Sequence, residues 1–165
     1  MDRPETLAGM GSPAKALVTL ARNHPGSAMH FYSRVMGPLL FRHPGWVMSI
    51  LTFVAPECDK AVYSDETLKT RHLAAVREAF VQGGRGPAWD LHLYTRAWGL
   101  NLDDVRANAW LWHGNLDRTV PVAMGYYYAE HLPHVHAEFV EGEGHFSLPV
   151  RRMRDILRTL AEGLT

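Results

Sequence analysis

The sequence predicts an α/β protein, with a mostly helical region up to about residue 100 followed by two parallel strands and their flanking helices. Two observations predict this fold class. The first part, 1–100, has apolar side chains at helical spacing between proline and glycine breaks, and it has no run typical of a strand. In the second part, 101–165, two short strand-like segments are each followed by a helical pattern, and this order implies parallel strands joined by a crossover.

Three short helices are expected at the start of the chain, each bounded by proline. Ser12 followed by Pro13 is typical of an N-cap and a first helical position. Proline and glycine also mark the expected ends, because proline cannot continue a helix and glycine favours a helix terminus. The expected segments are Ser12 to His24, Ser27 to Gly37 and Pro44 to Pro56.

The next helix has the clearest pattern of the first part. It starts after Ser64, carries acidic residues in its first turn and has side chains of one face at steps of four. Gly83 and Gly84 end it. A further helix is expected to open at Gly86-Pro87 and to run through Trp98.

Two strands and two helices are expected in the second part. Ala109 to Gly114 is a brief apolar run ending in glycine, as expected of a parallel strand that is covered on both faces. A helix from Pro121 to Pro133 and a strand from Val135 to Val140 follow. The last helix, Leu148 to Leu164, has leucine, isoleucine and methionine along one face.

Candidate functional side chains lie in the loops that follow the two strands. Asp117 lies in HGNLDRTVP, and His145 lies in EGEGHFSL. The carboxyl ends of parallel strands share one edge of a sheet, where functional groups collect. Gly142 and Gly144 allow the second loop to turn tightly and to direct the imidazole outward. We therefore expect the side chains of Asp117 and His145 to touch.

These two loops are similar to those of a known family. LWHGNLDRTVPV followed by EFVEGEGHFSL resembles the last two strands of α/β-hydrolases, where a pattern like HGxxDxxVP carries the acid and GxGH the histidine of a catalytic triad. The segment RGPAWDLHLYTRAWGLNLDDVRANAWLWHG resembles the passage from lid to strand in a bacterial subgroup. The resemblance covers about 7–162, is strongest over 85–148 and implies a partial α/β-hydrolase fold in which 1–100 is a lid.

The resemblance implies hydrolysis of an ester or related bond in a small apolar substrate, without a cofactor. Asp117 would orient His145 and stabilise its protonated form, and His145 would be the general base that takes a proton from a serine nucleophile. The family's chain order of nucleophile, acid and histidine agrees with the order of these two residues.

No nucleophile for this mechanism is found in the sequence. A G-x-S-x-G turn is expected upstream of Asp117, but no serine has glycine on both sides at that spacing. The sequence favours a truncated hydrolase that is inactive or very weak alone; a split gene, a degenerate gene and a non-catalytic binding or regulatory protein remain alternatives. The serines lie in MGSPA, PGSAM, FYSRV, VMSIL, VYSDE and HFSLP.

Large apolar residues of the first part are candidates for contacts with a substrate. Met29, Met36, Trp46 and Phe53 lie on the expected short helices, where they would suit an acyl or aromatic group. Ordinary helix packing explains the same residues about as well. Both interpretations stay open at this point.

Other groups of residues do not favour a metal or covalent site. His131, His134 and His136 are close in sequence, but no cysteine or acidic cluster joins them, so no metal site is expected. An acid on each side of Cys58 opposes formation of its thiolate. We therefore expect this cysteine to be buried or incidental.

Three further polar residues lie near the candidate pair. Glu141 and Glu143 are on the same glycine-rich loop as His145, and we expect them to be solvated rather than to act as an acid and a base. His113 lies at the end of the first strand, and we expect it to be a structural hydrogen-bond donor.

Charge and composition argue against several kinds of partner. The 17 Lys and Arg balance the 17 Asp and Glu, so no long-range field favours nucleic acid or anionic lipid. No apolar run reaches the ~20 residues that span a bilayer, and the amino terminus lacks a signal-peptide core. We expect a soluble, cytoplasmic protein. The unpaired edge of its first strand would invite pairing with a second copy.

Overall fold

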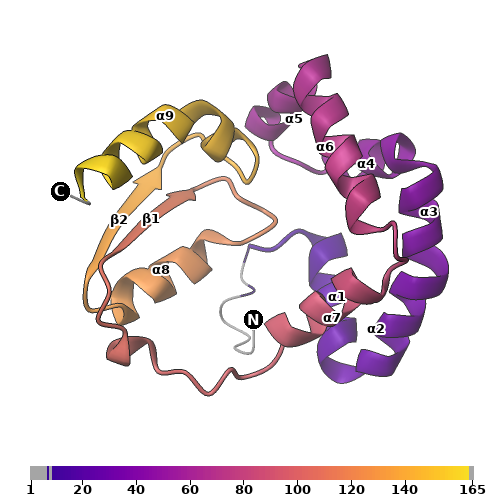
Figure 1. The fold of residues 1–165 in the computed structure, drawn as a ribbon, viewed down its shortest axis with the longest axis horizontal. Coiled ribbons are helices and arrows are strands. Elements are labelled where there is room, and N and C mark those ends of the chain that lie inside the picture. Colours follow the sequence, from indigo (N-terminus) through magenta and orange to yellow (C-terminus); the bar gives the residue numbers. More distant parts are fainter. Residues whose placement is uncertain (1–6, 8, 164–165) are drawn as a thin grey trace.

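The computed structural model of the 165-residue chain is a mixed α/β protein, with a helical half and a half built on a two-stranded parallel sheet (Figure 1). It describes residues 7 and 9–163, apart from the side chains of Val47 and Leu51. The elements are α1 Ser12–Asn23, α2 Pro25–Phe31, the π-helix η2 Tyr32–Met36, α3 Gly37–Arg42, α4 Pro44–Phe53, α5 Glu57–Tyr63, α6 Glu66–Ala79, α7 Arg85–Tyr94, the 3-10 helix η3 Leu102–Asp104, β1 Ala109–Gly114, α8 Val122–His131, β2 Val135–Val140 and α9 Ser147–Glu162.

The two strands pair in parallel, as the sequence predicts. Ala109 lies opposite Val135 at one end, and Gly114 lies opposite Val140 at the other. Helices α8 and α9 lie on opposite sides of the sheet (Figure 1), which agrees with the apolar run of β1, whereas β2 has three exposed residues, 136–138. Within the described residues no strand precedes β1, and β2 is its only strand partner. One edge of β1 is therefore without a strand partner, and self-association through it stays a prediction.

Proline sets most helix boundaries of the first half, with two small differences from the prediction. The N-cap of α1 is Gly11, one residue earlier than the expected cap, so Ser12 is already helical. Helix α2 starts at Pro25 rather than after Ser27. Because the fixed φ of proline suits a first helical turn, His24 closes α1 and the proline opens α2 at once.

The Gly37-Pro38 pair does not end the second helix, contrary to the prediction. The chain continues from α2 through η2 into α3. Pro38 has no N–H to donate, and its ring would crowd the carbonyl group of Arg34 in a regular helix. The backbone widens instead, and the N–H of Gly37 donates to the carbonyl oxygen of Tyr32. Proline therefore changes the helix type here without ending the helix.

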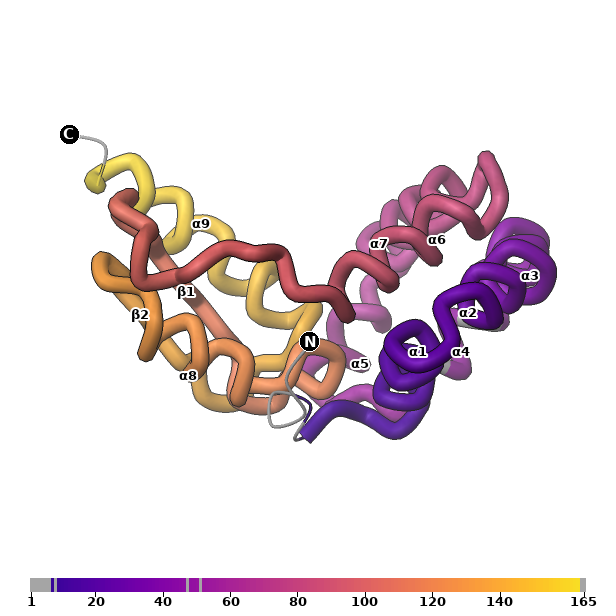
Figure 2. Tube along the Cα trace, turned by 90° about the horizontal axis from the view of Figure 1, so that it is seen from below, coloured from indigo at the N-terminus to yellow at the C-terminus, as the bar shows by residue number. Residues whose placement is uncertain are grey.

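Helix α5 is not expected from the sequence, because it is short and has no strong apolar stripe. It is nevertheless the helix of the first half that packs on α9 of the second half, and Figure 2 shows it at the junction of the two halves. Helix α6 lies within its predicted segment. Helix α7 starts at Arg85, one residue before the predicted Gly86, and ends at Tyr94, so Trp98 lies outside it.

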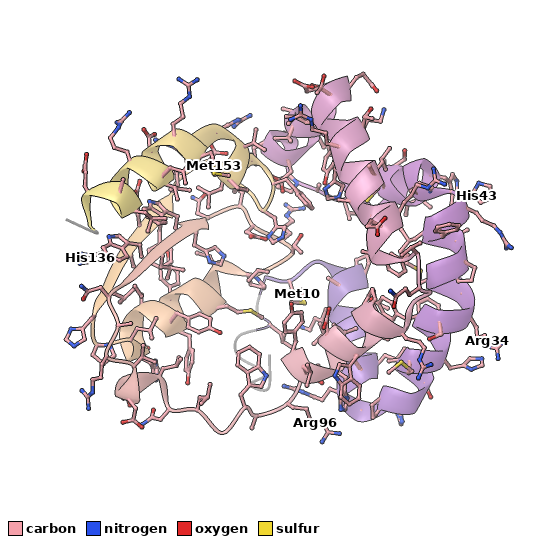
Figure 3. The ribbon with its side chains drawn as sticks, in the orientation of Figure 1. Met10, Arg34, His43, Arg96, His136 and Met153 are labelled. Atoms are coloured by element: carbon pink, nitrogen blue, oxygen red, sulfur yellow. The ribbon has the colours of Figure 1, made fainter. Side chains whose placement is uncertain are left out.

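A small hydrophobic cluster joins the two halves. Leu7, Met10 and Val18 of the first half pack with Met124 of α8, and Figure 3 shows Met10 between the halves. A second cluster, built on Leu40 and Phe80, lies within the helical half. The start of the chain thus packs against the sheet half, although the sequence groups it with the helical part.

None of the helices in the described residues combines the length and apolar character that crossing a membrane requires. The longest of them, α9, has 16 residues and ends at Glu162. Leu164, the expected last residue of this helix, lies outside the described residues.

Candidate functional site

The loops after β1 and β2 are held side by side by hydrogen bonds. The side-chain oxygen of Asn115 accepts from the N–H of Gly142 at 2.9 Å, and the N–H of Leu116 donates to the carbonyl oxygen of Glu143 at 2.9 Å. Gly142 has a φ of 75°, which a residue with a side chain rarely adopts. The predicted tight turn is therefore present at this glycine, and it fixes the course of the second loop.

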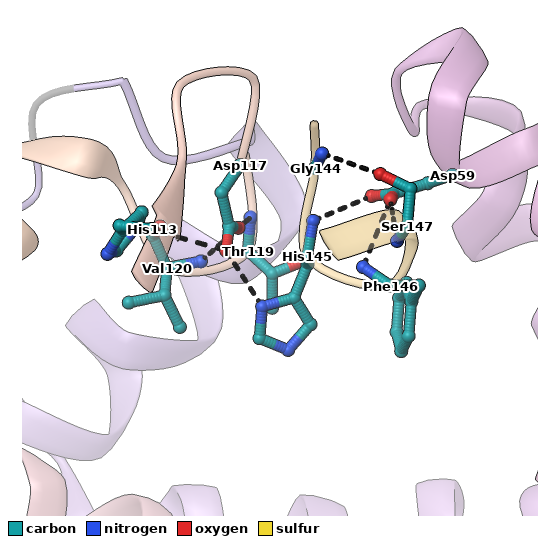
Figure 4. A network of polar contacts seen from close by, with 9 residues as sticks. All are labelled: Asp59, His113, Asp117, Thr119, Val120, Gly144, His145, Phe146 and Ser147. Atoms are coloured by element: carbon teal, nitrogen blue, oxygen red, sulfur yellow. Dashed lines mark hydrogen bonds and ion pairs between the residues drawn. The ribbon is translucent and has the colours of Figure 1, made fainter. Parts of the chain in front are cut away.

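Asp117 lies in the first loop with both carboxylate oxygens engaged (Figure 4). Its Oδ1 accepts from the N–H groups of Thr119 and Val120, both at 2.8 Å. Its Oδ2 lies 2.9 Å from Nδ1 of His145. The side chain is only 7% exposed, so little water competes for these bonds. The contact between Asp117 and His145 that the sequence predicts is present.

The imidazole of His145 is held at one nitrogen and open at the other. Nδ1 donates to the carboxylate of Asp117, while Nε2 has no hydrogen-bond partner within the described part of the chain. The side chain is 35% exposed. A neutral ring with its proton on Nδ1 presents a lone pair at Nε2, and this lone pair can take a proton from a hydroxyl group or water in reach.

Opposing effects act on the pKa of His145. Burial lowers it, whereas the hydrogen bond that His145 donates to Asp117 and the charges of Asp117 and Asp59 raise it, and the net result is a raised pKa. His72 of α6 contacts the same loop through the ring of Phe146, and burial lowers its pKa. The pKa values of these two histidines, one in the loop and one beside it, are therefore shifted in opposite directions.

We expect His145 to titrate above, and His72 below, the ordinary histidine pKa of 6.5. Protonated His145 then stabilises the fold; this contribution is complete below pH 6.5 and is lost as the pH rises through the raised pKa. The contribution of His72 is present above pH 6.5 and is lost as the pH falls through its lowered pKa. NMR titration of the ring protons measures both, and His145→Gln assigns the first. Equal shifts in one direction would contradict this prediction.

Asp59 of α5 is a second acidic group of the site, and sequence reasoning missed this role. The residue is 2% exposed. Its Oδ2 accepts from the N–H of His145 at 3.0 Å, and its Oδ1 accepts from the N–H groups of Phe146 at 3.0 Å and Ser147 at 2.8 Å (Figure 4). The sequence shows only an acid beside a cysteine. The hydrogen-bond partners of Asp59 are backbone groups 86 to 88 residues away, so no pattern in the neighbouring sequence indicates its role.

Gly144 leaves the space that Asp59 occupies. A Cβ on this glycine would lie 2.5 Å from both carboxylate oxygens of Asp59. Its φ is not positive, so it serves this close approach rather than the turn that the sequence suggests. Its N–H donates at 2.8 Å to the hydroxyl oxygen of Ser147, which is fully buried. The serine nearest to His145 in sequence is therefore a structural residue.

His113 and the loop glutamates have structural surroundings. Nε2 of His113 donates to the carbonyl oxygen of Val120 at 2.8 Å, as expected of a structural donor. Glu143 is buried and pairs with Arg151 of α9 at 3.4 Å, so the expectation that it is solvated was wrong. Glu141 is exposed, as expected. The arginine of α9 explains the burial of its partner, because a buried carboxylate needs a countercharge.

A largely apolar cavity of about 370 Å³ lies between the helical half and the loop that carries Asp117. Arg118, Thr119 and Phe146 contribute to its wall from the sheet half, and Asp59 and His72 contribute from the helical half. The remaining wall consists of Gly11, Pro13, Ala14, Leu17, Leu40, Met48, Thr52, Val54, Ala55, Pro56, Val76 and Phe80.

The four predicted substrate contacts do not line this cavity. Trp46 and Phe53 are 59% and 81% exposed. Met36 packs against the cluster of Leu40 and Phe80, and Met29 is half-buried on α2. A role for these four residues in substrate binding stays a prediction.

In the part of the chain that the structure describes, no group of three or more His, Cys, Asp or Glu side chains is placed to hold a metal ion. His131 lies with Nδ1 2.8 Å from the carbonyl oxygen of Tyr127, whereas His134 and His136 are exposed. Cys58 is a free, half-buried thiol. The acid and base pair is thus the chemically distinctive group among the residues singled out from the sequence.

No protein-family model, no curated protein and no solved structure matches this chain. The fold and the site together define a broad class of protein. The chain is a mixed α/β protein with an aspartate and histidine pair at the carboxyl edge of a parallel sheet.

Proposed function

We propose that Asp117 and His145 are the acid and base of a serine-type hydrolase site of the α/β-hydrolase kind. The observation that carries this proposal is the hydrogen bond between Nδ1 of His145 and a carboxylate whose other oxygen is held by two backbone N–H groups. Nε2 would take the proton of the attacking nucleophile and return it to the leaving group, while the charge of Asp117 stabilises the imidazolium that forms.

The proposal assigns the nucleophile to a segment outside these 165 residues or to a second chain. Ser147 lies next to the site in sequence, but its buried hydroxyl group accepts from Gly144 and is unavailable. The hydrogen-bond donors that stabilise an oxyanion are assigned to the same outside segment or second chain. Because such donors supply a large share of the rate enhancement, this chain alone would hydrolyse esters slowly.

The cavity supports a small apolar ester or related compound as the substrate class. Its volume of about 370 Å³ lies in the range of small-molecule sites. Phe146 lines it and contacts the imidazole of His145 with ring centroids 5.0 Å apart. An acyl group in this cavity would thus lie beside the proposed base.

We expect His145→Ala to lower the slow hydrolysis of p-nitrophenyl acetate by this chain roughly tenfold or more, because the variant lacks the only base of the proposed site. The release of nitrophenolate measures the rate. His134→Ala is the matched control, because His134 is an exposed histidine without a resolved role. Activity that is unchanged in His145→Ala, or equally reduced in the control, would reject the assignment.

A non-catalytic binding protein is the second candidate, and the presence of the cavity without a suitable serine favours it. In that case the cavity holds an apolar ligand, and the hydrogen bond between Asp117 and His145 only stabilises the two loops. The ester assay separates the two candidates, because a binding protein would show no hydrolysis that depends on His145. Hydrolysis that falls in His145→Ala but not in His134→Ala would reject the binding protein.

A further inference from the structure

We infer that Asp59 is a positioning residue for His145, which holds the backbone of the histidine loop from the helical half of the molecule. The orientation of the imidazole then depends on how α5 packs on α9. This inference rests on the proposed role of His145 and extends it to a residue 86 positions earlier in the chain.

Asp59 supplies the cap that the start of α9 lacks. The N-cap residue of this helix, Phe146, makes no side-chain capping bond. The first N–H groups of a helix have no partner within the helix and need an acceptor. Asp59 provides one for the consecutive N–H groups of His145, Phe146 and Ser147. A cap that normally comes from the adjoining residue therefore comes from a different half of the chain.

The burial of Asp59 makes these bonds strong determinants of geometry. Its carboxylate is nearly inaccessible, and backbone N–H groups at a helix start favour a negative charge. Gly144 contributes by having no side chain, since a Cβ there would collide with the carboxylate. The loop and the acid are thus shaped to fit each other, which an incidental surface contact would not require.

Two carboxylates act on one histidine from different directions. Asp117 contacts the ring of His145, and Asp59 contacts its backbone N–H. The charges of both raise the pKa of the imidazole against the effect of burial. The other titratable or charged groups around this loop are Tyr63 and His72, which contact Phe146, His113 beside Asp117, Glu143 with Arg151, and Arg118 in the cavity wall.

The test is Asp59→Asn, which keeps the shape and removes the charge. Its amide oxygen can still accept from Phe146 and Ser147, but its NH₂ group then faces the N–H of His145. We expect the pKa of His145 to fall in an NMR titration, and the amide of residue 145 to exchange roughly tenfold faster or more. Asp65→Asn is the matched control, because Asp65 caps α6 through the N–H groups of two residues.

The control should leave the titration of His145 unchanged, which separates a loss of capping from a specific effect on the imidazole. An unchanged pKa of His145 and unchanged exchange at residue 145 in Asp59→Asn would overturn the inference. So would an equal fall of that pKa in Asp65→Asn.

A second measurement needs no variant, in case Asp59→Asn does not fold. In the unsubstituted protein the amides of residues 145–147 should be protected from exchange, compared with the first turn of α4, which has no side-chain cap. Equal exchange at the two helix starts would reject the capping. None of these measurements involves hydrolysis, so a failure of the ester assay would leave the inference standing.

Discussion

Replacing Asp117 with alanine is expected to lower the free energy of unfolding by about 3 kcal/mol. The variant removes a nearly buried acceptor from the N–H groups of Thr119 and Val120 and from Nδ1 of His145. Donors that lose a charged acceptor in a protein interior are costly to leave unpaired. Chemical denaturation at neutral pH measures the change. A loss well below 1 kcal/mol would contradict the described contacts.

Asparagine at the same position separates stability from orientation. Its amide oxygen can keep both backbone bonds, so a smaller loss of stability is expected than with alanine. Its NH₂ group donates to Nδ1 of His145, and the neutral ring must then carry its proton on Nε2. Nitrogen NMR of the imidazole distinguishes the two tautomers. The same tautomer in Asp117→Asn and in the unsubstituted protein would be inconsistent with the geometry of this pair.

Gly144→Ala is expected to destabilise the protein by about 3 kcal/mol, in the upper range for single substitutions. The added methyl group would lie 2.5 Å from both oxygens of Asp59, which three N–H groups hold in place. Either the carboxylate leaves its buried position or the loop shifts, and both outcomes break hydrogen bonds. Thermal and chemical denaturation report the loss.

Gly26→Ala is the matched control, because this exposed glycine of α2 has no neighbour within 4 Å of its would-be Cβ. It should leave stability unchanged or raise it by up to about 1 kcal/mol. A double-variant cycle sharpens the test. The effects of Gly144→Ala and Asp59→Ala should be clearly less than additive, since each removes the same contact. Additive effects would show that the two residues act separately.

The sequence predicts the sheet half well because its signals are local. β1 is a short apolar run that ends in glycine, and β2 lies between a proline and a glycine; the observed β2, Val135–Val140, has the predicted bounds. The acid and base pair could be placed for the same reason: parallel strands bring the loops at their carboxyl ends together. The distance between Asp117 and His145 therefore agrees with a prediction made from order and spacing.

The helical half is predicted less completely because its details depend on distant contacts. At Pro38 local rules predict a break, whereas the chain forms a π-helix whose wider turn tolerates the missing donor. Helix α5 has no strong apolar face, and its polar residue Asp59 is buried only because α9 lies against it. No window of neighbouring residues contains this information.

The contact between Asp59 and Gly144 has a consequence for homologous sequences. While residue 59 is an aspartate, residue 144 cannot carry a side chain, so a substitution at one position depends on the residue at the other. A homologous protein with alanine at residue 144 and an aspartate at residue 59 would have this carboxylate displaced. Loss of the acid first would leave the N–H groups of residues 145–147 without this acceptor, so we expect the two positions to change together among homologous sequences.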